Sequence, residues 1–119
     1  MDKRQVVRII KNFSKALKAH GILFDYLILY GSYAKGKVHP DSDIDVAVVS
    51  KHFGKDKVEE GMTLFKIAGK IDSRIEPVPI STKAYENDTW IPLIYEIRAK
   101  GVMLKVQKLS SWQAIKLES

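Results

Sequence analysis

Two short segments carry residue types suited to phosphate and metal chemistry: Gly31-Ser32, and Asp43-Ile44-Asp45 twelve residues further along. Side chains two apart on a strand point to the same side, so Asp43 and Asp45 would present both carboxylates to one place. Two like charges that close repel each other, and a bound cation is the simplest electrostatic account of them. The chain has no cysteine, which leaves oxygen ligands and a magnesium-type ion as the natural metal chemistry.

Gly31 and Ser32 complement the aspartates as a phosphate-holding turn. Gly31 lets the backbone approach a phosphate without a Cβ in the way, and Ser32 offers a hydroxyl and an N–H at the start of an expected short helix. Lys35, one turn further on, could add a point charge to the same phosphates. A Gly-Ser pair alone is usually only a turn, and an isolated Asp-x-Asp more often caps or solvates. Their combination predicts a site for a nucleoside triphosphate held through magnesium.

The elements that must position these residues are two apolar runs preceded by a helix. Apolar spacing predicts a helix from Asp2 to His20, and continuous apolar runs predict buried strands at Tyr26–Tyr30 and Ile44–Val49. The connection between the strands is too short for the helical crossover that joins parallel neighbours, so we expect an antiparallel pair. That pairing would bring the glycine-serine turn beside the aspartates.

The remaining pattern predicts a second helix over Asp56–Asp72, a strand over Ile75–Ile80, a helix from Pro92 to Gly101 and a strand over Val102–Val106. The second helix is expected to bury Val58, Met62, Phe65, Ala68 and Ile71, with Leu64 on the flank. Two prolines, Pro77 and Pro79, confine the third strand to an edge or an end of the sheet.

These elements predict an α/β (α+β) fold with helices packed on a mixed sheet. We expect a single domain at residues 1–108 and a C-terminal tail at 109–119, because 119 residues are too few for two well-buried cores. In the tail, Trp112 and Ile115 leave three alternatives open: an anchor for a partner, an anchor for a second copy of the chain, or a disordered end.

Composition narrows the environment of the protein. No apolar run is long enough for a signal peptide or a membrane span, so we expect a cytoplasmic protein without a membrane partner. The 20 Lys and Arg against 14 Asp and Glu give a formal charge of +6, but they are spread along the chain without interleaved aromatic residues. We therefore read the basic residues as a solvated surface and do not expect nucleic acid as a partner.

Gly31-Ser32, the ten-residue gap and Asp43-x-Asp45 resemble the signature of the DNA polymerase beta-like nucleotidyltransferase superfamily. The size is similar to that of its minimal nucleotidyltransferases, or MNT domains, which are often encoded beside HEPN-domain partners. The resemblance implies a nucleotidyltransferase fold, two Mg²⁺ ions and ATP as substrate, with both metals held by Asp43 and Asp45. It also implies a third carboxylate, which by position is Glu76, to complete the catalytic metal's shell and help deprotonate the acceptor hydroxyl. Arg74 could instead pair with Glu76 in a plain salt bridge.

The resemblance implies an adenylyltransferase that moves AMP from ATP to a tyrosine of a HEPN-domain toxin, which would make this chain an antitoxin. The alternative is a non-catalytic module that neutralises its partner by contact. The presence of all four motif residues argues against a loss of catalysis, because unpaired carboxylates are costly unless a metal uses them. These residues are Gly31, Ser32, Asp43 and Asp45. The chain could also associate with further copies of itself as a homo-oligomer. A basic nucleic-acid-binding domain rests on charge alone.

Other polar and aromatic residues have plainer readings. The three histidines, His20, His39 and His52, lack metal-ligand spacing and are expected at a helix end and in two loops. Tyr85 and Trp90 could stack on a base, but a pair of half-buried aromatic side chains that close the core is the favoured reading. The Met62 and Phe65 pair is read as core.

Overall fold

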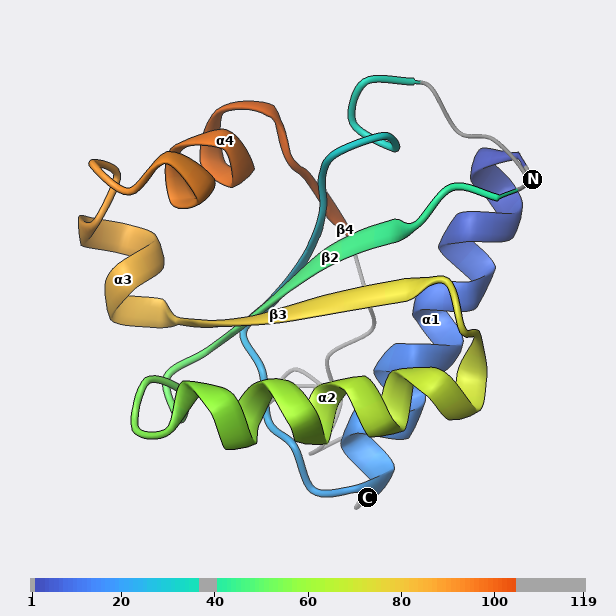
Figure 1. The fold of residues 1–119 in the computed structure, drawn as a ribbon, viewed down its shortest axis with the longest axis horizontal. Helices are drawn as coiled ribbons and strands as arrows, with labels where there is room; N and C mark the ends of the chain where they lie inside the picture. Colours follow the sequence, from blue (N-terminus) through green and yellow to red (C-terminus); the bar gives the residue numbers. More distant parts are fainter. Residues whose placement is uncertain (1, 37–40, 105–119) are drawn as a thin grey trace, which may run out of the picture.

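The computed structural model describes residues 2–36 and 41–104, which form one four-stranded mixed sheet with helices on both faces (Figure 1). The sequence analysis predicted each of these elements except the short helix α3, and their ends agree to within one residue, apart from the C-terminal end of β4, which borders residues outside the described part. In chain order the elements are α1 (Lys3–Ala19), β1 (Tyr26–Leu29), β2 (Ile44–Ser50), α2 (Lys57–Ile71), β3 (Ile75–Ser81), α3 (Thr82–Asn87), α4 (Pro92–Lys100) and β4 (Val102–Leu104).

The strands are ordered β3-β2-β1-β4, which confirms that β1 and β2 are neighbours, as predicted. β1 and β2 are antiparallel, with Leu29 opposite Val46, and the Tyr30 N–H donates to the Asp45 carbonyl at 3.1 Å. β3 joins the other side of β2 in parallel, and it lies at the edge of the sheet, as its prolines required. β4 pairs with β1; the expected continuation to Val106 and the boundary of the tail at residue 109 lie outside the described residues.

The two faces of the sheet are covered by different helices (Figure 1). Alternate residues along β1 and β2 enter one core or the other, because successive strand side chains point to opposite faces. The core under α1 and α2 contains Val6, Ile10, Phe13, Leu17, Leu27, Leu29, Val46, Val48, Leu64 and Ile67. The smaller core under α3 and α4 contains Ile28, Ala47, Val49, Ile80, Ile94 and Ile97.

The inward face predicted for α2 was wrong in most of its members. Leu64, Ile67 and Ala68 are buried, whereas Val58, Met62 and Phe65 are exposed by 73%, 55% and 57%. Only Ala68 and the partly buried Ile71 were placed correctly. Apolar residues occur on both sides of this helix, so helical spacing alone does not say which side meets the sheet.

None of the helices within the described residues combines the length and the apolar character required to cross a bilayer.

Two adjacent substitutions on α2 test which side of this helix carries the stability. We expect Leu64→Ala to lower the free energy of unfolding by about 2–5 kcal/mol, because it opens a cavity in the core. Phe65→Ala, measured in dilute protein, should change it by less than about 1 kcal/mol, because its ring is exposed. Urea denaturation followed by circular dichroism measures both. Equal losses from the two variants would contradict the observed orientation of α2.

Candidate active site

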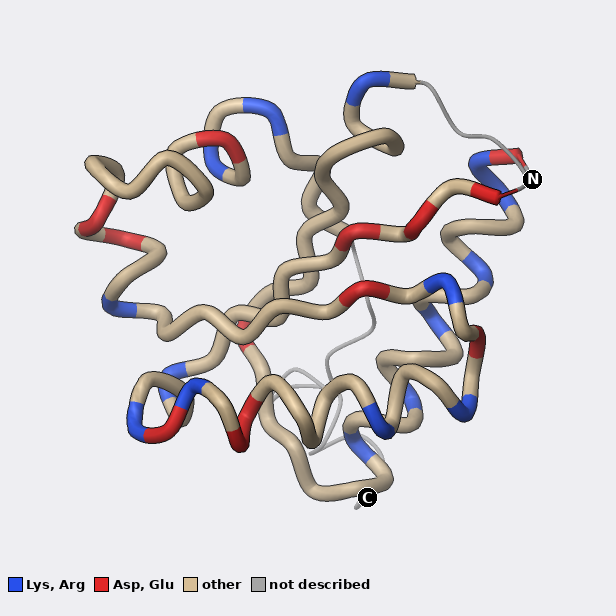
Figure 2. The backbone as a smooth tube through the Cα atoms, viewed as in Figure 1, with Lys and Arg blue, Asp and Glu red and all other residues tan. Residues whose placement is uncertain are grey.

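The carboxylates singled out in the sequence gather where β2 and β3 begin. Asp45 and Glu76 are partners in the parallel register, so their backbones are about 5 Å apart. Both belong to the set of alternate residues that faces α3 and α4, and so does Tyr30 at the end of β1. Figure 2 shows the acidic segments of β2 and β3 side by side at this end of the sheet. The sheet therefore brings together residues from three strands that are far apart in the sequence.

Gly31 lies directly against this acidic group. Its φ is +63°, a left-handed conformation that favours glycine, and a Cβ added there would collide with the Asp45 carboxylate oxygen Oδ2. The glycine thus serves two purposes, a sharp exit from β1 and room for the Asp45 side chain. This contact confirms the predicted proximity of Gly31 and Asp45.

The segment after Gly31 is a succession of turns, and the short helix expected to begin at Ser32 is not formed in residues 31–36. The Lys35 N–H donates to the Gly31 carbonyl at 3.1 Å, and the Gly36 N–H donates to the Tyr33 carbonyl at 3.0 Å. Gly36, with φ +72°, takes the left-handed conformation that ends helices. The hydrogen bonding that begins at Gly31 therefore does not extend into a helix within residues 31–36. Ser32 is partly buried, and Lys35 is exposed.

Asp43 stands one residue before β2 and is exposed, whereas Asp45 is partly buried. The pKa of Asp45 is raised above its usual value of 3.8, first by burial and then by the negative charges of Asp43, Glu76 and Glu96. The cause is physical crowding of like charges in a partly desolvated place. The site is therefore an acidic cluster that favours a cation.

Two residues of this site were missed in the sequence. Burial, followed by the charges of Asp45, Glu96 and Glu76, raises the pKa of Tyr30 to about 12, so its hydroxyl keeps its proton and remains a donor. Tyr30 had a local signal, since it precedes Gly31 and alternates with Ile28 onto the same face. Glu96, on α4, had none, because only the packing of α4 on the sheet carries it to the strand ends.

The donor set fits a hard divalent cation, since it consists of carboxylate oxygens with a tyrosine hydroxyl beside them. Within residues 2–36 and 41–104, no three Asp, Glu, His or Cys side chains are close enough together to hold a metal ion. Ionised carboxylates repel each other, so we expect Asp43 and Glu76 to close on a cation only when its charge offsets that repulsion.

The alternative role of Glu76, a salt bridge with Arg74, competes with a pairing that the structure does contain. Arg74 makes a bidentate pair with Asp72, with Nε donating to Oδ1 at 2.9 Å and a terminal nitrogen donating to Oδ2 at 2.7 Å. This pairing, through its side-chain hydrogen bonds, lowers the pKa of Asp72. Glu76 is an exposed side chain next to Asp45, on the face where Asp45 lies.

The other polar and aromatic candidates lie away from the carboxylates or serve packing. His20 caps the end of α1, where its Nδ1 is 2.8 Å from the Ala16 carbonyl oxygen, and His52 lies in the turn after β2; His39 is outside the described residues. Tyr85 packs on Tyr26 at 5.7 Å between ring centroids, which confirms its role in closing the core. The same expectation was wrong for Trp90, whose side chain is 78% exposed.

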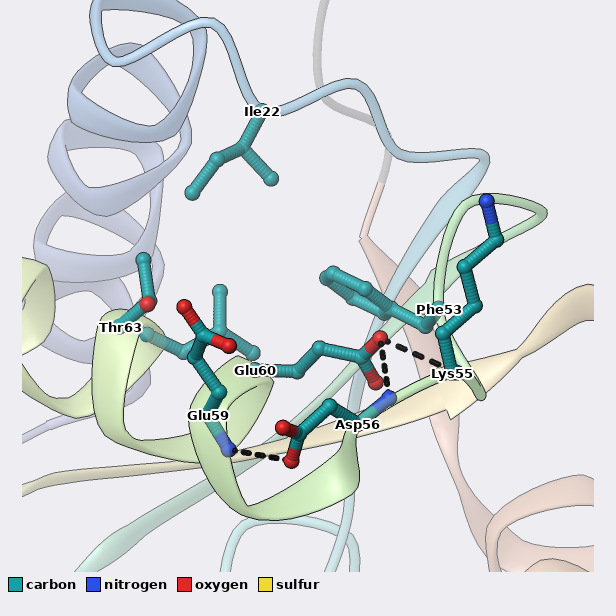
Figure 3. A pocket seen from close by; sticks show the side chains of 8 residues that line it. Ile22, Phe53, Lys55, Asp56, Glu59, Glu60 and Thr63 are labelled. Carbon is teal, nitrogen blue, oxygen red and sulfur yellow. Dashed lines mark hydrogen bonds between the residues drawn. The ribbon is translucent and has the colours of Figure 1, made fainter.

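A separate cavity of about 300 Å³ opens at the far end of β2 (Figure 3). Ile22 faces α2 across it, and Glu60 accepts hydrogen bonds from the backbone of the preceding loop, including the Gly54 N–H at 2.9 Å. Phe53 in its wall follows the end of β2, whereas Asp45 is near the start, about 17 Å from that end along the strand. This hollow is therefore distinct from the acidic site.

The described structure is thus an α/β domain in which a glycine turn at the end of one strand lies against Asp45 on the next strand, with Glu76 in register on the strand beyond it. Comparison with known proteins identifies the family of this domain. A family model described as a nucleotidyltransferase domain matches residues 10–102, and the chain belongs to this family. A protein of Methanocaldococcus jannaschii named as a candidate protein adenylyltransferase, MJ0141, is 32% identical over 101 residues, which are 82% of this chain and 97% of the relative.

Solved structures share the fold at lower identity. A candidate nucleotidyltransferase from Sulfolobus solfataricus has a TM-score of 0.59 at 14% identity, covering 83% of this chain and 78% of its own. A toxin-antitoxin protein crystallised with AMP-PNP has a TM-score of 0.58 at 23% identity over 91% and 90% of the two chains. A mutant of the toxin-antitoxin MntA-HpeT has a TM-score of 0.55 at 20% identity over 90% and 88%. These similarities confirm the nucleotidyltransferase fold predicted from the sequence.

Two glycines of one turn separate backbone strain from crowding of the carboxylate. Gly31→Ala and Gly36→Ala both force a left-handed residue, at φ +63° and +72°, but only the first introduces a Cβ next to Asp45. We expect Gly36→Ala to lower the free energy of unfolding by about 1–2 kcal/mol and Gly31→Ala to lower it by more. Thermal and urea denaturation measure the difference. Equal losses would mean that Gly31 is needed only for its φ.

The raised pKa of Asp45 predicts a stability gain on neutralisation. In EDTA at pH 7 we expect Asp45→Asn to raise the free energy of unfolding, because the ionised carboxylate is disfavoured in the folded state. The gain should shrink as the pH falls through the raised folded pKa and vanish below the usual value of 3.8, where both states bind the proton. Asp41→Asn, in the exposed turn, is the matched control. A loss of stability in Asp45→Asn at pH 7 would refute this electrostatic account.

Proposed function

We propose that this protein is a magnesium-dependent adenylyltransferase that transfers AMP from ATP to a hydroxyl group, and that the hydroxyl belongs to a tyrosine of a HEPN-domain toxin. The observation that carries the proposal is the contact between Gly31 and Asp45, with Glu76 in register beside them. This arrangement puts a turn suited to phosphate next to carboxylates suited to a cation. The proposed biological role is that of an antitoxin.

Each residue of the site has a proposed task. Asp43 and Asp45 would hold two Mg²⁺ ions, and Glu76 would complete the shell of one of them. Gly31 and Ser32 would bind the triphosphate through backbone N–H groups and the serine hydroxyl, and Lys35 would add a positive charge near the same phosphates. Magnesium, when bound, supplies the positive charge that neutralises the polyphosphate and the leaving pyrophosphate.

The proposed reaction is transfer of AMP from ATP to the acceptor hydroxyl, and it uses these residue positions. The acceptor oxygen forms a bond to the α-phosphorus while the bond from that phosphorus to the bridging oxygen breaks, and pyrophosphate leaves. The acceptor's proton passes to a carboxylate, for which Glu76 is the proposed base because it is exposed toward incoming substrate. Tyr30 keeps its own proton and can donate a hydrogen bond within the site.

The acceptor and the partner are proposed from the relatives. The name of the Methanocaldococcus jannaschii relative describes transfer of an adenylyl group to protein. Two of the structural neighbours are toxin-antitoxin proteins; one contains AMP-PNP, and the other carries two aspartate-to-glutamate substitutions two positions apart. The same spacing separates Asp43 from Asp45. These facts support ATP, the aspartate pair and a toxin partner for this chain.

The setting of the reaction is also a proposal. We place the protein in the cytoplasm, where ATP and magnesium are present. A chain without cysteine needs no oxidising compartment, because it forms no disulfides. We do not propose nucleic acid as a substrate, because the basic segments are distributed over several elements instead of forming one stripe (Figure 2).

Label transfer tests the proposal directly. The purified chain is incubated with α-labelled ATP, Mg²⁺ and the protein encoded beside it, and labelled protein is followed by gel and by mass spectrometry of tyrosine-containing peptides. We expect Asp43→Asn to slow transfer by more than about 100-fold, because it removes a ligand that offsets charge in the transition state. Asp41→Asn, two residues away in the exposed turn, should leave transfer intact.

The outcomes separate the enzyme from a binding module. Tyrosine label that is lost in EDTA and in Asp43→Asn supports the proposed reaction. Stoichiometric binding of the neighbouring protein without any transfer would favour neutralisation by contact instead. Transfer that survives Asp43→Asn would remove the aspartate pair from the mechanism.

A further inference from the structure

The outer side of α2 carries an apolar stripe with no described element packed over it. Val58, Met62 and Phe65 are spaced four and three residues apart, which places them in one line along the helix. Their side chains are exposed by 73%, 55% and 57%, while Leu64 and Ile67 on the opposite side are buried against the sheet. A contiguous exposed apolar line of this kind is a candidate contact surface.

We propose that a second copy of this chain packs on the stripe, with the two α2 helices antiparallel about a two-fold axis near Met62. In such a pair each Met62 lies close to the axis, and Val58 of one copy lies opposite Phe65 of the other. A two-fold contact requires a surface complementary to itself. The stripe meets this requirement, because its apolar residues are distributed almost evenly on either side of Met62.

The charges beside the stripe give a second, independent argument for self-association. Glu59 follows Val58 and Lys66 follows Phe65, so both flank the stripe on the same side, seven residues or nearly two helical turns apart. In an antiparallel pair related by a two-fold axis the same flanks meet. Glu59 of each copy then lies beside Lys66 of the other, which forms two opposite-charge contacts. In a parallel two-fold pair the flanks that carry Glu59 and Lys66 would lie on opposite sides of the interface, so these charges would not meet across it and the opposite-charge contacts would be lost. The charges therefore favour the antiparallel arrangement.

A surface of this size predicts a weak dimer. One helix pair is at the low end of the area that specific interfaces bury, so we expect association in the micromolar range or weaker. The stripe is on the α1/α2 face of the sheet, whereas Asp45 and Glu76 face α3 and α4. The dimer therefore leaves the acidic site open, and this inference does not depend on the proposed activity.

Sedimentation equilibrium tests the association across a concentration series from about 10 µM to 1 mM, the range that suits such an interface. The weight-average mass of the full chain should rise from 13.5 kDa toward twice that value. Met62→Lys should raise the dissociation constant by at least about tenfold, because it sets two like charges side by side near the axis. Met103→Lys, at a methionine 47% exposed on β4, is the matched control and should leave the dissociation constant unchanged.

A charge exchange tests the orientation. Glu59→Lys alone and Lys66→Glu alone should each weaken the dimer by severalfold, and the double variant should restore it. Both single-variant losses should be smaller in high salt. Circular dichroism checks that the exposed substitutions leave the fold intact. A wild-type mass of 13.5 kDa at every concentration, or a dimer indifferent to Met62→Lys, would overturn the proposal. Failure of the charge exchange to restore association would overturn the antiparallel arrangement.

Discussion

Gly31 and the carboxylate of Asp45 share one small space where β1 ends and β2 begins, and the rest of the site depends on that contact. Any residue with a Cβ at position 31 would meet Oδ2 of Asp45. The antiparallel register of β1 and β2 creates this closeness, and the hydrogen bond from Tyr30 to the Asp45 carbonyl fixes it. A turn suited to phosphate and a carboxylate suited to a cation thus become neighbours through backbone geometry.

The sheet divides stability and chemistry between its faces and ends. Long buried side chains of α1 and α2 fill one face, and the other face is apolar only as far as α3 and α4 reach. Beyond them the strand ends carry Asp45, Glu76 and Tyr30, where burial and like charges raise the pKa of Asp45 and of Tyr30. A cation would relieve that cost, so this crowded acidic region of the described structure is where the proposed metal chemistry is placed.

α2 has two apolar sides, and only one of them is buried in the domain. Its inner side joins the larger core, and its outer side presents an apolar line to solvent on the face opposite the acidic site. A helix with two apolar sides has weak amphipathicity, and selection for core packing alone does not require it. The arrangement would let the proposed self-association and the proposed nucleotide chemistry occur at separate surfaces.

The sequence by itself determined the described elements except α3, the antiparallel strand pair and the closeness of Asp45 to the glycine turn, because these follow from local periodicity, proline placement and a short connection. Only the tertiary structure decided which side of α2 is buried, since spacing cannot distinguish two apolar sides. Only the tertiary structure brought Glu96 to the strand ends and placed Glu76 in register with Asp45, because both depend on contacts between distant segments. Local patterns encode elements, whereas the charge environment of a side chain is set by what packs around it.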